Sequence, residues 1–296
     1  MAKGEWEHTT RLINAAASIL EKEQPMTIRQ LFYRLVSAGA IPNDQKHYQL
    51  VIRTMTKARD DGRISFEHIV DRSRPKYAAN VWTNPEEYGE TIRTAYRKDY
   101  WHTQPNYVEL WVEKDAIIGS IEHLAGELGI TVRVQRGFIS TTRAHEIAQH
   151  FDGISKPIKV FYLGDHDPSG QCIETDARDR IREYSTVPFL VERLAIFASD
   201  ILKFNLPPLR IKQSDPRATK FHARHGADCV ELDALPPDVL RQRIKDAVEE
   251  LLDLDLWERA KSVEQVELAS IREAVNRWNN LAVADPREFQ DIRAGI

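Results

Sequence analysis

In the first part of the chain, apolar residues recur at helical spacing in three successive segments. These runs are separated by proline and glycine, which end helices. A short alternating segment follows them and predicts a strand or wing. Three helices and a wing are the outline of a winged helix-turn-helix, whose third helix commonly enters a DNA groove. The predicted helices cover about residues 6–23, 28–38 and 44–60, and the wing covers residues 63–70.

The pattern changes near residue 106, where short apolar runs begin to alternate with helical periods. Such alternation predicts a mostly parallel sheet, which places ligands at the carboxyl ends of its strands. The last 60 residues are acidic and helical, and residues 75–104 resemble a connector with one helix at about 85–97. The predicted strands are 107–112, 130–134 and 158–163, and the predicted helices are 115–128, 141–151, one after Gly170, 238–252 and 256–283.

Two of the predicted strands end in acidic residues. Glu113 follows the strand 107–112, and Asp165 and Asp167 follow the strand 158–163. Because parallel strands end at one edge of a sheet, these three carboxylates are expected to converge. Neighbouring carboxylates repel one another unless a cation neutralises them, and all-oxygen ligands suit Mg²⁺. The two aspartates alone are weak evidence, since an aspartate at such a turn often caps the next helix.

Tyr33 is a candidate nucleophile in the second predicted helix. It lies roughly 130° from the centre of the apolar stripe by the helical period. Arg29 comes one turn earlier on nearly the same face. A guanidinium favours the phenolate form of a tyrosine and also binds phosphate, so the pair suits attack on a phosphodiester. The alternative is that Tyr33 packs at the margin of its helix or against a neighbouring domain.

The net charge of −4 gives no indication of a nucleic-acid partner, but the charge is uneven along the chain. Residues 1–80 hold 13 basic and 9 acidic side chains, whereas residues 225–296 hold 9 and 16. Basic residues of the third predicted helix lie opposite its apolar stripe, which suits phosphate contacts, although a solvated helix face is the alternative. The candidate DNA-binding residues are Lys46, Arg53, Lys57, Arg59 and Arg63, with Arg72, Arg74 and Lys76 nearby. A second basic cluster, at 203–224, is either a phosphate track or a basic loop.

The composition, with 42% hydrophobic and 29% charged residues, is that of a globular protein and excludes a fibre or a disordered chain. No apolar run is long enough to span a membrane, and charges occupy the place of a signal peptide's apolar core. Cys172 and Cys229 are far apart, which argues against a disulfide scaffold and fits a reducing compartment. We therefore expect a cytoplasmic, nucleoid-associated protein without a membrane partner.

Residues 110–114 read LWVEK, and residues 164–170 read GDHDPSG. Together these motifs resemble the Toprim domain, the metal-dependent module of topoisomerases, primases and some nucleases. The resemblance covers about residues 105–200. It implies a Rossmann-like, mostly parallel sheet in which Glu113 is a general acid/base or metal ligand and Asp165 and Asp167 hold Mg²⁺.

The Arg-x-x-x-Tyr motif in a winged helix that precedes such a domain is similar to the A subunit of topoisomerase VI and the related meiotic double-strand-break transesterase. This resemblance implies a covalent bond between Tyr33 and double-stranded DNA, and a homodimer in which the tyrosine of one protomer meets the metal site of the other. No GxxxxGK[ST] motif occurs, so a topoisomerase cycle needs a separate ATPase subunit. The chain is shorter than that family's, and its linker differs.

The expected fold class is α/β, with an N-terminal winged helix-turn-helix, a Toprim domain and a helical C-terminal extension. The expected domains are residues 1–80 for DNA binding, a linker at 81–104, and residues 105–296 for the Toprim domain with its C-terminal helices. The leading functional hypothesis is Mg²⁺-dependent DNA strand cleavage with Tyr33 as nucleophile and Arg29 and Glu113 as further catalytic residues. The alternatives are a Toprim nuclease that uses water instead of the tyrosine, and a non-catalytic DNA-binding accessory protein.

Overall fold

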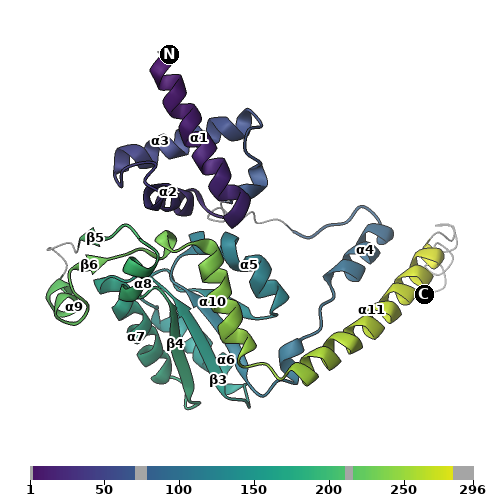
Figure 1. Cartoon of the computed structure of the whole chain (residues 1–296). Helices are drawn as coiled ribbons and strands as arrows, with labels where there is room; N and C mark the ends of the chain where they lie inside the picture. The colour runs from purple at the N-terminus through teal and green to yellow at the C-terminus, as the bar shows by residue number, and fades with distance from the viewer. Residues whose placement is uncertain (1–2, 71–78, 211–215, 283–296) are drawn as a thin grey trace. The chain divides into compact units, whose positions relative to one another are not determined.

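The computed structural model describes residues 3–70, 79–210 and 216–282 (Figure 1). The chain divides into two compact units, of which the first comprises residues 1–75 and 106–251 and the second residues 76–105 and 252–296. This division differs from the expected domains 1–80, 81–104 and 105–296. The reason is that the segment expected as a linker packs on the C-terminal helix and forms the second unit with it.

Three helices begin the first unit, as the sequence predicts: α1 (Lys3–Glu23), α2 (Ile28–Ser37) and α3 (Gln45–Asp60). A capping box starts α2, because the Gln30 N–H donates to Thr27 Oγ1 at 3.2 Å and the Thr27 N–H donates to Gln30 Oε1 at 2.8 Å. The strand expected at 63–70 is wrong. This segment forms the 3₁₀ turn η1 (Phe66–His68), capped by the hydroxyl of Ser65, and makes one isolated parallel bridge through Ile69.

A four-stranded sheet with the order β2-β1-β3-β4 follows, and all of its strands are parallel. The α/β class is therefore confirmed, and the sheet is compatible with a Rossmann-like arrangement. The strand β4 was not predicted, because charged residues interrupt its apolar pattern. The strands are β1 (Tyr107–Val112), β2 (Thr131–Val134), β3 (Ile158–Leu163) and β4 (Phe189–Ala195).

Helices cover both faces of this sheet (Figure 1). On one face, α6 (Thr141–Asp152) and α7 (Pro168–Arg182) enclose a core built around Trp111, Phe151 and Phe189. On the other face lie α5 (Ile118–Glu127), which follows the 3₁₀ turn η3 (Asp115–Ile117), and α10 (Pro237–Glu249). Side chains alternate between the two faces along a strand, so both faces of β1 are buried apart from its first residue.

Five short elements lie between β4 and α10, and the sequence pattern predicted none of them. They hold the described part of the basic cluster, whose Lys212 lies outside the described residues. They also bring the segment 229–234 beside the sheet edge through a bridge between His166 and Val230. The five are α8 (Ala198–Lys203), β5 (Leu209–Arg210), α9 (Ala218–His225), β6 (Asp228–Cys229) and the 3₁₀ turn η4 (Leu232–Ala234).

The second unit consists of α4 (Pro85–Ala95), the 3₁₀ turn η2 (Tyr100–His102) and α11 (Leu254–Ala282). Its segments are joined by polar contacts as well as by packing. Lys98 pairs with Glu267 at 2.8 Å, and the hydroxyl of Tyr100 donates to Glu264. These contacts engage the aromatic and charged residues near position 100.

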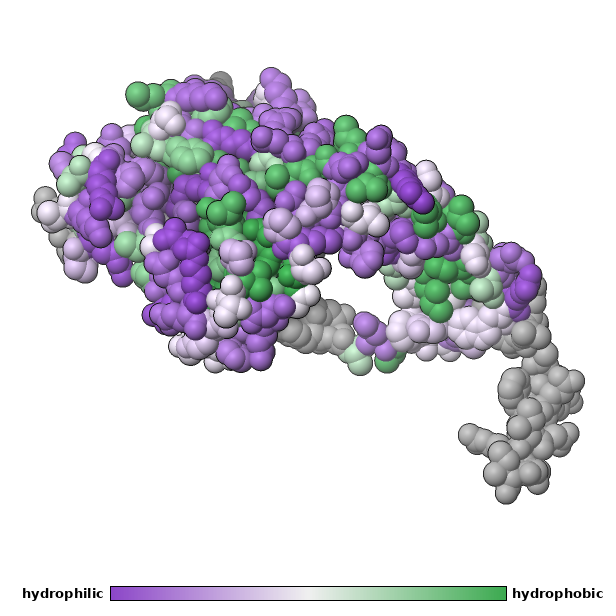
Figure 2. All heavy atoms as spheres, turned by 90° about the horizontal axis from the view of Figure 1, so that it is seen from below, coloured by the Kyte–Doolittle hydropathy of each residue, from purple (hydrophilic) through white to green (hydrophobic). Residues whose placement is uncertain are grey.

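None of the helices described is long and apolar enough to cross a membrane. Hydrophilic residues cover most of the face drawn in Figure 2.

Candidate functional site

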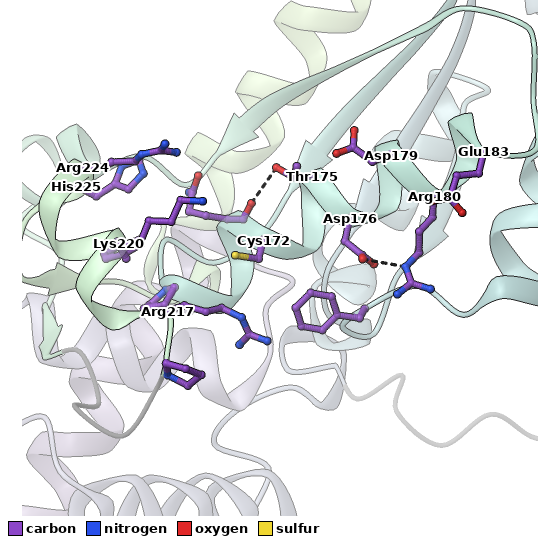
Figure 3. Close-up of a pocket in the computed structure, with 15 residues that line it drawn as sticks. Cys172, Thr175, Asp176, Asp179, Arg180, Glu183, Arg217, Lys220, Arg224 and His225 are labelled. Atoms are coloured by element: carbon purple, nitrogen blue, oxygen red, sulfur yellow. Dashed lines mark hydrogen bonds and ion pairs between the residues drawn. The ribbon is translucent and has the colours of Figure 1, made fainter.

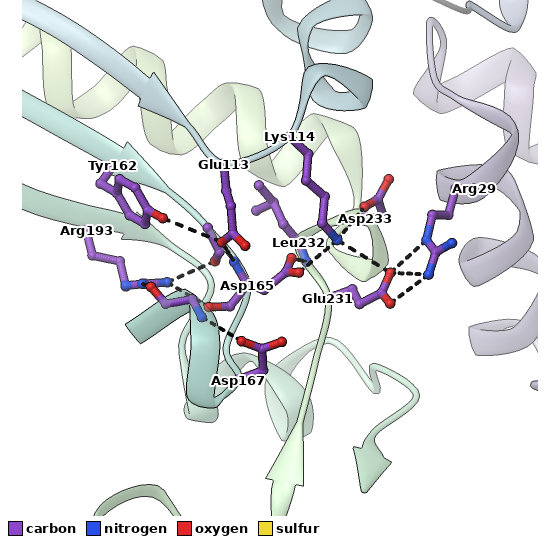
Figure 4. A network of polar contacts seen from close by, with 12 residues as sticks. Arg29, Glu113, Lys114, Tyr162, Asp165, Asp167, Arg193, Glu231, Leu232 and Asp233 are labelled. Atoms are coloured by element: carbon purple, nitrogen blue, oxygen red, sulfur yellow. Dashed lines mark hydrogen bonds and ion pairs between the residues drawn. The ribbon is translucent and has the colours of Figure 1, made fainter. Parts of the chain in front are cut away.

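Two of the three predicted residues, Glu113 and Asp165, are in direct contact at the carboxyl edge of the sheet. Since Val112 and Leu163 are paired at the ends of β1 and β3, the residues that follow them leave the sheet side by side. The Glu113 N–H donates to Leu163 O at 2.9 Å, and the Asp165 N–H donates to Glu113 Oε2 at 2.9 Å (Figure 4). The expected convergence of Glu113 and Asp165 is thus present in the structure.

The loop 164–170 needs its two glycines because it passes very close to its neighbours. A Cβ at Gly164 would lie 2.7 Å from Glu113 Oε2, and a Cβ at Gly170 would lie 2.4 Å from Asp165 O. Arg193 of β4 holds the same loop, since its guanidinium donates to Gly164 O at 2.9 Å and to Gly170 O at 3.1 Å. The loop that carries the two aspartates is therefore fixed from both sides.

Asp167 has a structural role at the start of α7. It is the N-cap of α7, and its Oδ1 accepts a hydrogen bond of 2.6 Å from the Gly170 N–H. This is the helix-cap alternative that the sequence left open. Because only one oxygen of Asp167 caps the helix, the other is available for a ligand.

Replacing Asp167 with alanine is expected to lower the free energy of unfolding by about 1 kcal/mol, because the cap is lost. Replacement with asparagine is expected to change stability by much less, since an amide oxygen caps a helix as well as a carboxylate does. Urea unfolding of the two variants measures this difference. Equal destabilisation of both would show that the charge of Asp167, and not its cap, stabilises the loop.

Lys114 connects the predicted carboxylates with two that the sequence did not single out. Its Nζ lies 2.8 Å from Asp165 Oδ2, 3.4 Å from Asp233 Oδ2 and 3.6 Å from Glu231 Oε2 (Figure 4). Asp233 is fully buried, and its Oδ1 has no hydrogen-bond partner within the described residues. One ammonium group thus faces three carboxylates.

Burial and mutual repulsion dominate the electrostatics of this edge. Burial and the charge of Asp165 raise the pKa of Glu113 to about 7. Burial likewise raises the pKa of Asp233. Burial by itself would lower the pKa of Lys114, but the carboxylates of Asp233, Asp165 and Glu231 outweigh it and raise that pKa. The edge therefore holds more carboxylates than cations and favours an added positive charge.

Arg29 and Tyr33 both lie near this network. Arg29 forms a bidentate pair with Glu231, with nitrogen–oxygen distances of 2.7 and 2.6 Å. Its guanidinium lies 5.8 Å from the centre of the Tyr33 ring. Tyr33 is only 4% exposed, although the helical period places it away from the apolar stripe. The packing alternative for Tyr33 is therefore present in the structure.

As expected, Arg29 acts to lower the pKa of Tyr33, but its effect is outweighed. Burial and the charge of Glu231 raise the pKa of the Tyr33 hydroxyl, and they outweigh the opposite effect of Arg29. The main reason is that Tyr33 is buried, and the carboxylate of Glu231, which pairs with Arg29, adds to the rise.

The donor chemistry of the three predicted ligands fits Mg²⁺, because all of their donors are carboxylate oxygens in a cluster of like charge. Glu113 Oε1 and Asp167 Oδ2 make no hydrogen bond or ion pair with any described residue. Both carboxylate oxygens of Asp165 have a partner. Lys114 pairs with Oδ2, and the Leu232 N–H donates to Oδ1. Among the described residues, no group of three or more histidine, cysteine, aspartate or glutamate side chains is arranged to hold one metal ion.

The predicted DNA-binding residues of α3 and its following turn are surface residues, with one exception. Lys46, Arg53, Lys57 and Arg63 are exposed. Arg59 is half-buried, and its guanidinium lies 5.3 Å from the centre of the Phe66 ring. The nearby Arg72, Arg74 and Lys76 lie outside the described residues.

Sequence reasoning missed Glu231 and Asp233, and gave Lys114 no role. Residues 229–233 read CVELD, which repeats the pattern of apolar residues followed by two acidic residues at a spacing of two. The same pattern drew attention to Asp165 and Asp167. It was overlooked here because β6 has only two residues and is too short to appear as a strand in the sequence.

The sequence matches no protein-family model, and no curated protein is similar to it.

Proposed function

We propose that this protein cleaves DNA strands in a Mg²⁺-dependent reaction at the edge formed by Glu113, Asp165 and Asp167. The observation that carries this proposal is the direct hydrogen bond between the Asp165 backbone and the Glu113 carboxylate at the carboxyl ends of two adjacent parallel strands. Ligands of such sheets bind at this edge. The resemblance of the two motifs to the Toprim domain supports the same assignment.

In this proposal Glu113, Lys114 and the two aspartates have different roles. Glu113, with a pKa of about 7, suits proton transfer near neutral pH. Asp165 and Asp167 are the ligands that would hold the metal, and Mg²⁺ supplies charge stabilisation for the phosphate that is cleaved. Lys114 orients Asp165 through the contact at 2.8 Å.

We propose water as the nucleophile, and so favour the nuclease alternative over transesterification by Tyr33. A buried tyrosine with a raised pKa is a poor nucleophile, and its neighbouring arginine is occupied by Glu231. One observation favours the tyrosine as the second candidate. The chain of contacts Arg29–Glu231–Lys114–Asp165 links α2 to the carboxylate edge within the same unit.

Trapping of a protein–DNA adduct decides between these two nucleophiles. After incubation with plasmid DNA and Mg²⁺ and rapid denaturation, we expect no covalent adduct, and we expect Tyr33→Phe to retain cleavage within about threefold. Phenylalanine keeps the ring that packs against Phe32 at 5.3 Å, so the variant is expected to fold. An adduct that forms with the native protein and is lost in Tyr33→Phe would establish transesterification instead.

Double-stranded DNA is the proposed substrate, with α3 as the proposed contact to its phosphates. The exposed Lys46, Arg53 and Lys57 support this proposal, since phosphate contacts by lysine and arginine supply affinity that does not depend on sequence. Three helices at the start of the chain are compatible with a helix-turn-helix contact to DNA. A homodimer and a separate ATPase subunit are further proposals from the topoisomerase resemblance, and they belong to the transesterification candidate.

A further inference from the structure

A pocket of about 850 Å³ opens beside the carboxylate loop, between α7 and α9 (Figure 3). It lies next to the proposed catalytic edge, because Pro168, which directly follows Asp167, lines it. The side chain of Arg217 also reaches the start of α7, where its NH1 lies 3.4 Å from Ser169 Oγ. The volume is in the range of pockets that hold a ligand of nucleotide size.

The two walls of this pocket carry opposite charge. Lys220 and Arg224 come from α9 and Arg217 is its N-cap, whereas Asp176, Asp179 and Arg180, which pairs with Asp176 at 2.8 Å, come from α7 (Figure 3). Lys220 and Arg224 are exposed and make no ion pair with any described residue. The α9 wall is thus suited to phosphate groups, and the α7 wall repels them.

An aromatic side chain lies at the same pocket. Phe138 is 46% exposed, and the guanidinium of Arg217 lies 4.9 Å from the centre of its ring. It follows a tight turn in which Arg136 and Gly137 have φ values of 38° and 86°. An exposed aromatic ring next to a basic wall is the combination with which proteins hold single-stranded nucleic acid, since bases stack on the ring while cations follow the backbone.

We propose that this pocket binds an unpaired strand of DNA next to the carboxylate edge. The phosphates lie along Arg217, Lys220 and Arg224, and a base stacks on Phe138. The other bases turn towards the α7 wall, away from the basic residues that hold the phosphates. This inference rests on the proposed function, because cleavage at the carboxylate edge is the reason to expect an unpaired DNA strand beside it. The residues that line the pocket do not include the proposed metal ligands.

Binding without cleavage tests this inference. The full chain is titrated, in the presence of EDTA, against a fluorescein-labelled single-stranded deoxyoligonucleotide of about 12 nucleotides, a length within the usual range for such sites. The same oligonucleotide annealed to its complement is the duplex probe. Fluorescence anisotropy gives the dissociation constant of each, and the salt dependence gives the number of phosphates contacted.

We expect Phe138→Ala to weaken single-strand binding by roughly 5- to 100-fold and to leave duplex binding unchanged. We expect Phe138→Trp to restore it, because tryptophan also stacks. Lys220→Glu is expected to weaken single-strand binding and to lower the slope of log affinity against log salt by about 0.7. Lys245→Glu, an exposed charge change on α10, is the matched control and is expected to have no effect on single-strand binding.

The proposal is overturned if the native protein does not bind the single strand. It is also overturned if Phe138→Ala and Lys220→Glu bind it as the native protein does, or weaken both probes equally. Cleavage of plasmid DNA with Mg²⁺ is measured separately on the same preparations. Pocket-dependent binding by a protein that does not cleave DNA would contradict the proposed function alone, and cleavage without pocket-dependent binding would contradict this inference alone.

Discussion

Glu113→Gln is expected to lower the rate of Mg²⁺-dependent DNA cleavage by about 10²- to 10⁴-fold, which is the usual contribution of a general acid or base. Glutamine removes the proton-transfer group and one candidate metal ligand. It keeps the shape of the side chain, and its amide oxygen still accepts the hydrogen bond from the Asp165 N–H. The initial rate of plasmid nicking, measured at several Mg²⁺ concentrations, checks this expectation.

Glu127→Gln is the control for this variant, because it makes the same chemical change at a side chain that is 61% exposed on α5. It is expected to nick plasmid at the native rate. The Glu113→Gln protein is expected to be at least as stable as the native one, since the substitution removes a charge that Asp165 and Asp167 repel. A Glu113→Gln protein that is folded and cleaves DNA normally would exclude Glu113 from the chemistry.

Arg133→Ala is expected to have the largest effect on stability, lowering the free energy of unfolding by about 3–5 kcal/mol. Arg133 forms a bidentate pair with Glu109, at 2.6 and 2.7 Å, and Glu109 is fully buried. Without the guanidinium, the carboxylate keeps the hydroxyl of Tyr107 and the indole N–H of Trp111 as donors, and His150 Nε2 lies 3.7 Å from its Oε1. Urea unfolding, followed by circular dichroism, measures the loss.

Two further variants separate the cost of an unpaired buried charge from the loss of a contact. In the double variant Glu109→Gln/Arg133→Met no charge is left unpaired, so most of the stability is expected to return. Lys159→Ala breaks an ion pair with Glu192, whose side chain is 52% exposed, and is expected to cost less than about 1 kcal/mol. Equal losses for Arg133→Ala and Lys159→Ala would contradict the role assigned to Glu109.

The parallel sheet was predictable from the sequence because its strands are short apolar runs bounded by helices. The same pattern predicted the meeting of Glu113 and Asp165, since the ends of adjacent parallel strands must share an edge. β4 escaped prediction because Glu192 and Arg193 interrupt its apolar residues. The strand expected at 63–70 was wrong because an alternating pattern over a few residues does not distinguish a strand from a capped turn.

The burial of Tyr33 and the position of Glu231, neither of which the sequence predicted, have one physical cause. Helical periodicity describes which face of α2 is apolar, but it does not say which distant segment covers the other face. The turn η4 covers that face and brings Glu231 to Arg29, a contact between residues 202 positions apart. Only the folded chain reveals this contact, and burial together with Glu231 raises the pKa of Tyr33 although Arg29 lowers it.

Cleavage of supercoiled plasmid by the native protein and by Asp165→Asn, with Mg²⁺ and with EDTA, tests the proposed metal-dependent site most directly. Asparagine keeps the size of Asp165 and an oxygen to accept the Leu232 N–H, but it removes the charge that a cation and Lys114 require. The proposed site predicts nicked or linear plasmid with the native protein and Mg²⁺ only, and intact plasmid with Asp165→Asn. Cleavage by Asp165→Asn at the native rate, or no cleavage by the native protein with any divalent cation, would contradict it.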